Sequence, residues 1–239
     1  MDVVGSLQRV WDAQAEANTL RSILGVRETG EPWTLDQFFE SGVHEIEAVL
    51  ARYSSGPSRA LDFGCGIGRI TQALARRFEL AWGVDVSPRM VELASAHNRA
   101  GDRCRYSVNA QPDLGIFDDG YFDLVWSQIT LQHIPPAAAS YISEFFRVVR
   151  PGGLVMFQLP ARRHARTLRE RAQAALLRFV PGALLRRLGV VEVHGMERAR
   201  VEKIIALAGG SLLAVEVDHS LGDAWLSYRY VATKNGASR

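Results

Sequence analysis

Short apolar runs alternate with stretches of helical periodicity from about residue 57 to residue 160. The runs are bounded by glycine, proline or acidic residues, as is typical of buried strands. Their alternation with helices predicts a parallel sheet with right-handed crossovers. We expect strands at 59–63, 80–84, 104–108, 122–127 and 154–159, and helices at about 69–77, from Ser87 onward, and after Pro135-Pro136 as far as Val149.

Two helices are predicted ahead of this unit. The first covers residues 6–20, and the second follows Thr34, which forms a capping-box pattern with Gln37. Apolar residues then keep a helical period to about Tyr53. Phe38 and Phe39 in this stretch favour packing into the core over contact with a cofactor.

The end of the chain has a different pattern of strands. A helix at 196–208 precedes a strand at 211–217, and the short link 220–224 joins that strand to another at 225–233. A connection this short cannot be a parallel crossover, so these two strands should pair antiparallel. This hairpin argues against a dinucleotide-binding dehydrogenase domain, which is built from two parallel halves.

A glycine-rich loop follows the first strand of the central unit. Gly64, Gly66 and Gly68 stand at alternate positions, which lets the backbone turn sharply and approach a ligand closely. The next strand ends at Asp85, nineteen residues after Gly66. Nucleotide-binding folds place a carboxylate for the ribose hydroxyls at this spacing. The two features together predict a nucleotide-cofactor site.

Motifs in the same order as in a known family extend this prediction. The chain resembles the class I S-adenosylmethionine-dependent methyltransferases in the glycine loop, the second strand, the fourth strand with the segment after it, and the turn into the fifth strand. These segments are 61–69, 83–87, 122–127 followed by 131–134, and 149–153.

The resemblance implies an α/β, Rossmann-like, mostly parallel seven-stranded sheet with an antiparallel last strand and helices on both faces. It implies S-adenosylmethionine as the cofactor and methyl transfer as the activity. We expect one domain of four parts: a helical preface at 1–56, in which 33–42 is a candidate lid, a cofactor-binding core at 57–160, a basic helical insertion at 161–194, and a last helix with the closing hairpin at 195–239.

Ligands of open α/β sheets bind at the carboxyl ends of the strands, and this rule selects the candidate site residues. The helix start after the glycine loop can meet a carboxylate through backbone N–H groups. Asn109 stands where the family often has an acidic residue near the adenine. The candidate cofactor-binding residues are Asp62, Gly64, Cys65, Gly66, Gly68, Arg69, Asp85, Val86, Asn109, Ala110, Ser127 and Gln128.

His133 is the first candidate for the catalytic base, because it follows the fourth strand on the edge where acceptor and methyl donor should meet. An attacking hydroxyl must lose its proton, and histidine is the usual base for this step. A structural role, in capping a helix or binding a backbone carbonyl, remains open. Asp218 and His219 form the rival pair, because an acid beside a histidine can orient a substrate hydroxyl or hold a cation. No metal site is expected.

The stretch 162–187 stands apart because it holds eight arginines and one acidic residue, Glu170. A solvated amphipathic helix, a cap over the acceptor, a dimer surface and a contact with acidic lipid remain open. No RNA-binding motif accompanies the arginines, so a nucleic-acid partner is not expected.

Composition fits one globular domain in a reducing compartment. The chain has 239 residues, 47% of them hydrophobic, with a net charge of +2. Its two cysteines lack metal or redox spacing, and neither a signal peptide nor a membrane span is evident, so a cytoplasmic location is expected.

The acceptor remains open at this level. We expect O-methylation of a hydroxyl on a small molecule, such as a sugar or a natural-product intermediate. A lipid or quinone methyltransferase, an N-methyltransferase of a small metabolite, and a protein that binds the cofactor without catalysis are the alternatives.

Overall fold

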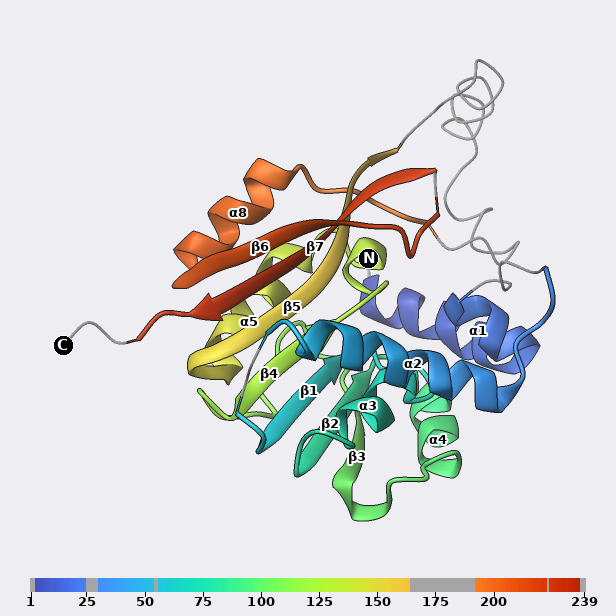
Figure 1. The fold of residues 1–239 in the computed structure, drawn as a ribbon. Helices are drawn as coiled ribbons and strands as arrows, with labels where there is room; N and C mark the ends of the chain where they lie inside the picture. Colours follow the sequence, from blue (N-terminus) through green and yellow to red (C-terminus); the bar gives the residue numbers. More distant parts are fainter. Residues whose placement is uncertain (1–2, 25–29, 54–55, 164–191, 223, 237–239) are drawn as a thin grey trace.

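The computed structural model describes residues 3–24, 30–53, 56–163, 192–222 and 224–236. They form a seven-stranded sheet with the strand order β3-β2-β1-β4-β5-β7-β6 (Figure 1). The strands are β1 (Arg59–Phe63), β2 (Leu80–Asp85), β3 (Cys104–Val108), β4 (Phe122–Ser127), β5 (Val149–Arg163), β6 (Gly210–Asp218) and β7 (Trp225–Lys234).

The first five strands pair in parallel, and β7 pairs antiparallel with both β5 and β6. The predicted closing hairpin is therefore confirmed. Its second strand, β7, lies inside the sheet and leaves β6 at the edge. The fold is the class I methyltransferase arrangement that the resemblance implies.

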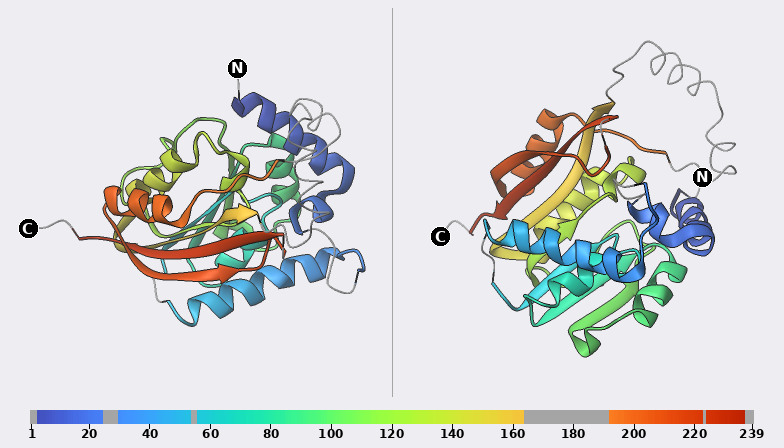
Figure 2. Two further views of the ribbon diagram at one scale, coloured as in Figure 1. Left: turned by 90° about the horizontal axis from the view of Figure 1, so that it is seen from above. Right: turned by 45° about the vertical axis from the view of Figure 1, so that its right-hand side comes forward.

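Helices cover both faces of the sheet (Figures 1 and 2). The α-helices are α1 (Val3–Leu24), α2 (Leu35–Leu50), α3 (Arg69–Leu74), α4 (Pro88–Ala96), α5 (Ala138–Val148) and α8 (Arg198–Leu207). One apolar cluster joins α5 and α8 to the sheet, and a second joins α2 and α3 to the opposite face. A third cluster joins α1, α2 and Met90 of α4.

Local sequence signals explain the helix starts. Thr34 and Gln37 form both hydrogen bonds of the capping box. Ser87 caps α4 by accepting from the backbone N–H of Met90, and Pro88 occupies the first helical position, where no N–H is needed.

Several boundaries differ from the predicted ones. Helix α1 is longer at both ends, and α3 stops at Leu74. Strand β5 starts at Val149, because Val149 already pairs with Phe122 before a register shift brings Leu154 beside Leu124. Gly152 has φ 75°, which fits the turn expected within 149–153.

The predicted basic helix lies outside the described residues, because only the ends of 161–194 are described. Among the described residues, no helix is both long enough and apolar enough to cross a membrane.

Candidate functional site

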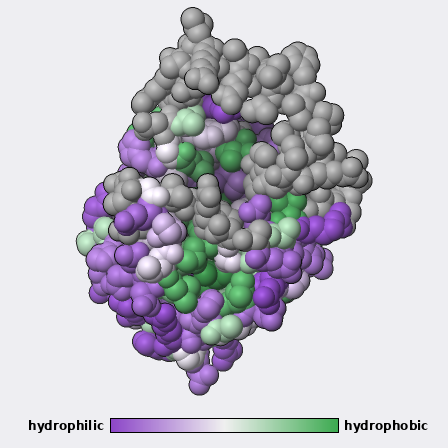
Figure 3. Space-filling view, turned by 90° about the vertical axis from the view of Figure 1, so that its right-hand side faces the viewer, coloured by the Kyte–Doolittle hydropathy of each residue, from purple (hydrophilic) through white to green (hydrophobic). Residues whose placement is uncertain are grey.

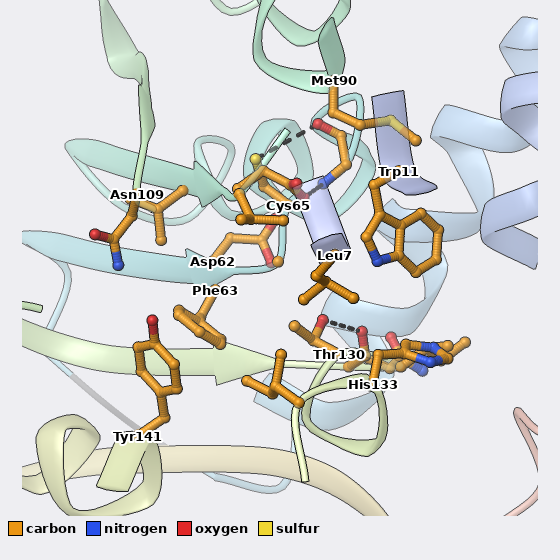
Figure 4. Close-up of a pocket in the computed structure, with 18 of the residues that line it drawn as sticks. Leu7, Trp11, Asp62, Phe63, Cys65, Met90, Asn109, Thr130, His133 and Tyr141 are labelled. Atoms are coloured by element: carbon orange, nitrogen blue, oxygen red, sulfur yellow. Dashed lines mark hydrogen bonds between the residues drawn. The ribbon is translucent and has the colours of Figure 1, made fainter. Parts of the chain in front are cut away.

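A cavity of about 350 Å³ opens at the carboxyl ends of β1, β2 and β4. This volume is within the range of small-molecule sites. Figure 4 shows Asn109, Phe63 and Tyr141 toward one end of the cavity and Leu7, Trp11, Thr130 and His133 toward the other, with Asp62 and Cys65 between them.

The glycine loop has a backbone that side chains would disrupt. Gly64, Gly66 and Gly68 all have positive φ, at 79°, 52° and 84°. A Cβ on Gly64 would overlap the side chain of Thr130, and one on Gly68 would come within 2.5 Å of the Tyr106 hydroxyl. Gly64 and Gly66 line the cavity, while Gly68 is the N-cap residue of α3 and is not among the lining residues.

Asp85 holds the loop from the end of β2. Its Oδ2 accepts from the backbone N–H of Gly66 at 2.9 Å, and its Oδ1 accepts from the N–H of Ser87 at 3.0 Å. Burial raises the pKa of the carboxyl above its usual value, and these N–H donors oppose that rise. Each oxygen keeps a lone pair that can accept from a ligand hydroxyl.

Asp62 lies deeper, between the loop and the sheet. Its carboxyl is 3% exposed and accepts from Thr71 Oγ1 at 2.7 Å. Burial raises the pKa of Asp62 to about 7, against the lowering effect of Thr71 and Arg69. A cationic group entering the cavity beside Asp62 would favour the ionised carboxylate.

Arg69, at the start of α3, is a cationic residue of the cavity lining. Its guanidinium donates to Glu45 Oε2 at 3.1 Å and to Gln128 Oε1 at 3.2 Å. Glu45 also accepts from Arg229 of β7, which in turn pairs with Asp218 at 3.0 Å. The alternating charges link the closing hairpin and α2 to the cofactor loop.

Helix α1 forms the wall that faces the glycine loop. Leu7, Trp11 and Ile23 line the cavity, and a Cβ on Gly66 would lie 3.1 Å from Ile23 Cδ1. Asp12 fastens the helix by accepting from the Ser87 hydroxyl at 2.5 Å. Figure 3 faces this side of the molecule and shows hydrophobic residues gathered in a hollow with hydrophilic residues around them.

His133 stands on the cavity wall after β4, at the end of the short 3₁₀ helix Leu131–His133. Its Nδ1 lies 2.9 Å from the carbonyl oxygen of Glu192, and its ring meets the edge of Trp11 with centroids 5.3 Å apart. A carbonyl only accepts, so Nδ1 carries the proton and Nε2 keeps its lone pair. Burial lowers the pKa of the imidazole below its usual value, which favours this neutral form near pH 7.

The structure brings most of the predicted residues together. Of the candidate cofactor-binding and catalytic residues, those that line the cavity are Asp62, Gly64, Cys65, Gly66, Arg69, Asp85, Val86, Asn109, Gln128 and His133. Ala110 and Ser127 are not among the lining residues. Ser127 is 1% exposed, and its hydroxyl has no hydrogen-bond partner among the described residues.

The rival catalytic pair lies elsewhere. Neither Asp218 nor His219 lines the cavity. The Asp218 carboxylate is committed to Arg229 and to Ser220, and His219 is exposed. The structure therefore places Asp218 in an ion pair with Arg229 and outside the lining of the cavity.

The part of the preface that lines the cavity also differs from the expected one. The lining residues come from α1, and none comes from the candidate lid 33–42. Phe38 and Phe39 are buried in the core, as their pattern predicted. The sequence predicted a helix at 6–20, but no local signal distinguished a cavity wall from core.

Sequence reasoning also missed Thr130 and Tyr141. Thr130 packs on Gly64, and the Tyr141 hydroxyl donates to the Gln111 carbonyl at 2.5 Å, beside Asn109. Both come from segments after β4, and only the folded chain brings them to the carboxyl edge.

The residues present fit S-adenosylmethionine. Asp85 offers acceptors to a ribose, Asn109 offers an amide to a base, and Arg69 and Asp62 offer charges to a carboxylate and an ammonium group. Gly64 and Gly66 line the cavity without side chains, and a Cβ on Gly64 would collide with Thr130. Fold and site thus agree with those of the class I S-adenosylmethionine-dependent methyltransferases.

Comparison with known proteins agrees. Residues 61–157 match the family model described as "Methyltransferase domain". The chain is 29% identical to a ubiquinone biosynthesis O-methyltransferase of Methylococcus capsulatus over 75% of this chain and 65% of that relative. It is 31% identical to the 2-methyl-6-phytyl-1,4-hydroquinone methyltransferase of Synechocystis over 53% of this chain and 41% of that relative. The chain thus spans less than two thirds of each of these two relatives.

Solved structures share the fold. Magnesium protoporphyrin IX methyltransferase of Synechocystis, solved with bound S-adenosylhomocysteine, superposes with a TM-score of 0.65 at 19% identity, over 95% of this chain and 98% of that one. A phosphoethanolamine N-methyltransferase of Haemonchus contortus gives a TM-score of 0.67 at 18% identity, over 96% and 61%.

Proposed function

We propose that the protein transfers the methyl group of S-adenosylmethionine to a hydroxyl on a small, largely apolar aromatic acceptor of the quinol or catechol type. The observation that carries this proposal is His133, a neutral imidazole beside the apolar wall of α1 whose Nε2 has no hydrogen-bond partner among the described residues. The cofactor supplies an activated methyl group on a sulfonium.

The chain's own residues supply position and a proton acceptor. Asp85 and the glycine loop hold the nucleoside, while Trp11 and Leu7 keep water from the acceptor end. Nε2 of His133 accepts the proton of the attacking hydroxyl as that oxygen takes the methyl group. The Glu192 carbonyl holds the ring in the tautomer that this step needs.

The apolar wall separates the acceptor classes. A sugar would need polar partners for many hydroxyls, whereas Trp11, Leu7 and Ile134 at the His133 end offer apolar surface. The names of the two relatives support a quinol-type acceptor over the sugar first expected. Free buried Cys65 and Cys104 are compatible with a cytoplasmic location. A homodimer stays a prediction.

The test is an acceptor panel with radiolabelled S-adenosylmethionine. The panel compares catechols and hydroquinones that carry alkyl chains of increasing length with monosaccharides and with primary amines. We expect transfer to the phenolic acceptors, with kcat/KM rising as the alkyl chain lengthens. Preferential methylation of a monosaccharide or an amine would refute the proposed acceptor class.

A further inference from the structure

One residue of the cavity wall has a strained backbone. Ile129, directly after Gln128, has φ 54° and is the only non-glycine residue with positive φ among those the structure describes. A residue branched at Cβ is a rare occupant of this region. Such strain persists only where the surroundings hold the backbone in place, and it is concentrated at functional sites.

The hydrogen bond that holds the backbone of Ile129 involves a buried side chain of the sheet. Its backbone N–H donates to Oε1 of Gln158 on β5 at 3.1 Å. Gln158 is 1% exposed, and its Nε2 donates to the hydroxyl of Ser227 on β7, which is fully buried. Two strands of the sheet therefore fix the backbone of one residue in the cavity wall.

The neighbours of Ile129 are held as well. Gln128 donates to Glu45 at 2.6 Å and accepts from Arg69. Thr130 donates to the Gln128 carbonyl at 3.0 Å, and its side chain packs on Gly64. The backbone N–H of His133 then donates to the Thr130 carbonyl at 3.0 Å. The turn 128–130 thus lies between the glycine loop and the candidate base and contacts both.

We propose that Gln158 is a positioning residue for methyl transfer. By holding Ile129 in the left-handed conformation, Gln158 fixes the cavity wall between the cofactor loop and His133. The fixed wall sets the distance between the methyl group and the acceptor oxygen. Transfer rates depend steeply on such positioning, and an error of about 1 Å costs up to about a hundredfold. The inference rests on the proposed methyl transfer, but not on the class of acceptor.

Four proteins test this role: the parent, Gln158→Met, Ile129→Gly and the double variant. Methionine is similar in length to glutamine and lacks the carbonyl acceptor. Glycine adopts positive φ freely, so the backbone of the Ile129→Gly variant needs no holder. The single Ile129→Gly variant and the double variant both lack the isoleucine side chain, so their comparison isolates the hydrogen bond.

We expect Gln158→Met to lower kcat on an alkylcatechol acceptor by about tenfold when Ile129 is present, and by less than about twofold in the Ile129→Gly background. Calorimetry should give the same affinity for S-adenosylhomocysteine in all four proteins within about threefold. An equal loss of kcat in both backgrounds, or no loss in either, would overturn the proposal.

A second readout needs no acceptor. The ¹³C resonance of S-adenosylmethionine labelled in its methyl group should shift between the parent and Gln158→Met in the bound state. The chemical shift of this resonance should be the same in the two proteins that carry Ile129→Gly. If no phenolic acceptor is methylated but this pattern holds, the acceptor class fails while the role of Gln158 stands. A shift of equal size in both backgrounds rules that role out.

Ser227→Ala replaces Gln158→Met if the latter fails to fold. This change keeps the hydrogen bond from the Ile129 N–H to Gln158 Oε1 and removes only the hydrogen bond from Gln158 Nε2 to Ser227. It should move the methyl resonance in the same direction by a smaller amount, and the Ile129→Gly change should again cancel the effect. A shift that persists in the Ile129→Gly background contradicts the proposal.

Discussion

The backbone N–H of Gly66 donates to Oδ2 of Asp85 at 2.9 Å across nineteen residues of sequence. The two features whose spacing predicted a nucleotide site are therefore directly bonded. The carboxylate both shapes the glycine loop and faces the cavity. A change at Asp85 should consequently act on the loop and on the ligand together.

Asp85→Asn should weaken binding of S-adenosylhomocysteine by about 2–4 kcal/mol. An amide has one acceptor oxygen, so it cannot keep both backbone N–H bonds and also receive ribose hydroxyls. Calorimetry measures the loss. Asp102→Asn, a change of the same kind at an exposed position, is the control and should bind like the parent. Equal affinity in the two variants would remove Asp85 from the cofactor site.

Gly66→Val should abolish cofactor binding while the protein stays folded. A branched side chain at φ 52° is strained, and its Cβ would stand 3.1 Å from Ile23 on the cavity wall. Gly101 supplies a matched control, because it has φ 58° with nothing within 4 Å of its Cβ position. Gly101→Val should carry similar backbone strain and still bind S-adenosylhomocysteine. If both variants bind S-adenosylhomocysteine with equal affinity, the glycine loop is not part of the cofactor site.

Asp62 should lose a proton when the cofactor binds near pH 6.5. Burial raises its pKa to about 7, and an ammonium group beside it would lower that pKa again. Calorimetry of S-adenosylhomocysteine in buffers of different ionisation enthalpy counts the released proton. Asp62→Asn keeps an acceptor for Thr71 and should release none. Proton uptake, or the same release in both proteins, would contradict the assignment.

The same carboxyl predicts how stability depends on pH in the free protein. Folded Asp62 binds a proton up to about pH 7, whereas the unfolded chain releases it near its ordinary value of about 3.9. The contribution of Asp62 to the free energy of unfolding should be full below about pH 4 and fall as the pH rises to about 7. Thermal unfolding of the parent and Asp62→Asn across this range measures the difference, which should grow with pH in favour of the variant. A constant difference would show that the folded carboxyl titrates normally.

Much of the fold was predictable because its signals are local. The capping box at Thr34, the cap at Ser87 and the short link 220–224 each involve neighbouring residues, and each led to the observed element. Most of the cofactor loop could be placed for the same reason. The carboxyl-edge rule then brought Arg69, Gln128 and His133 to the cavity correctly.

The rest depends on contacts between distant parts of the chain. Arg229 donates to Glu45, which lies 184 residues earlier in the chain, and it also forms an ion pair with Asp218. No local sequence pattern indicates that Asp218 has this partner. Trp11 has the same periodicity as any core residue, yet it lies against His133. The strain at Ile129 follows from Gln158 on another strand, and an isoleucine after a glutamine gives no sign of a left-handed turn.

The assignment of His133 as the base for a phenolic hydroxyl can be checked through the pH dependence of turnover. The parent, His133→Gln and Asp218→Asn are compared at saturating S-adenosylmethionine with an alkylcatechol. We predict that parental kcat falls only below the usual histidine pKa of about 6.5, because burial lowers the pKa of His133. His133→Gln should lose this acid limb and about 10²–10⁴ in kcat, whereas Asp218→Asn should keep the parental profile. Near-parental turnover with an unchanged pH profile in His133→Gln would contradict the assignment.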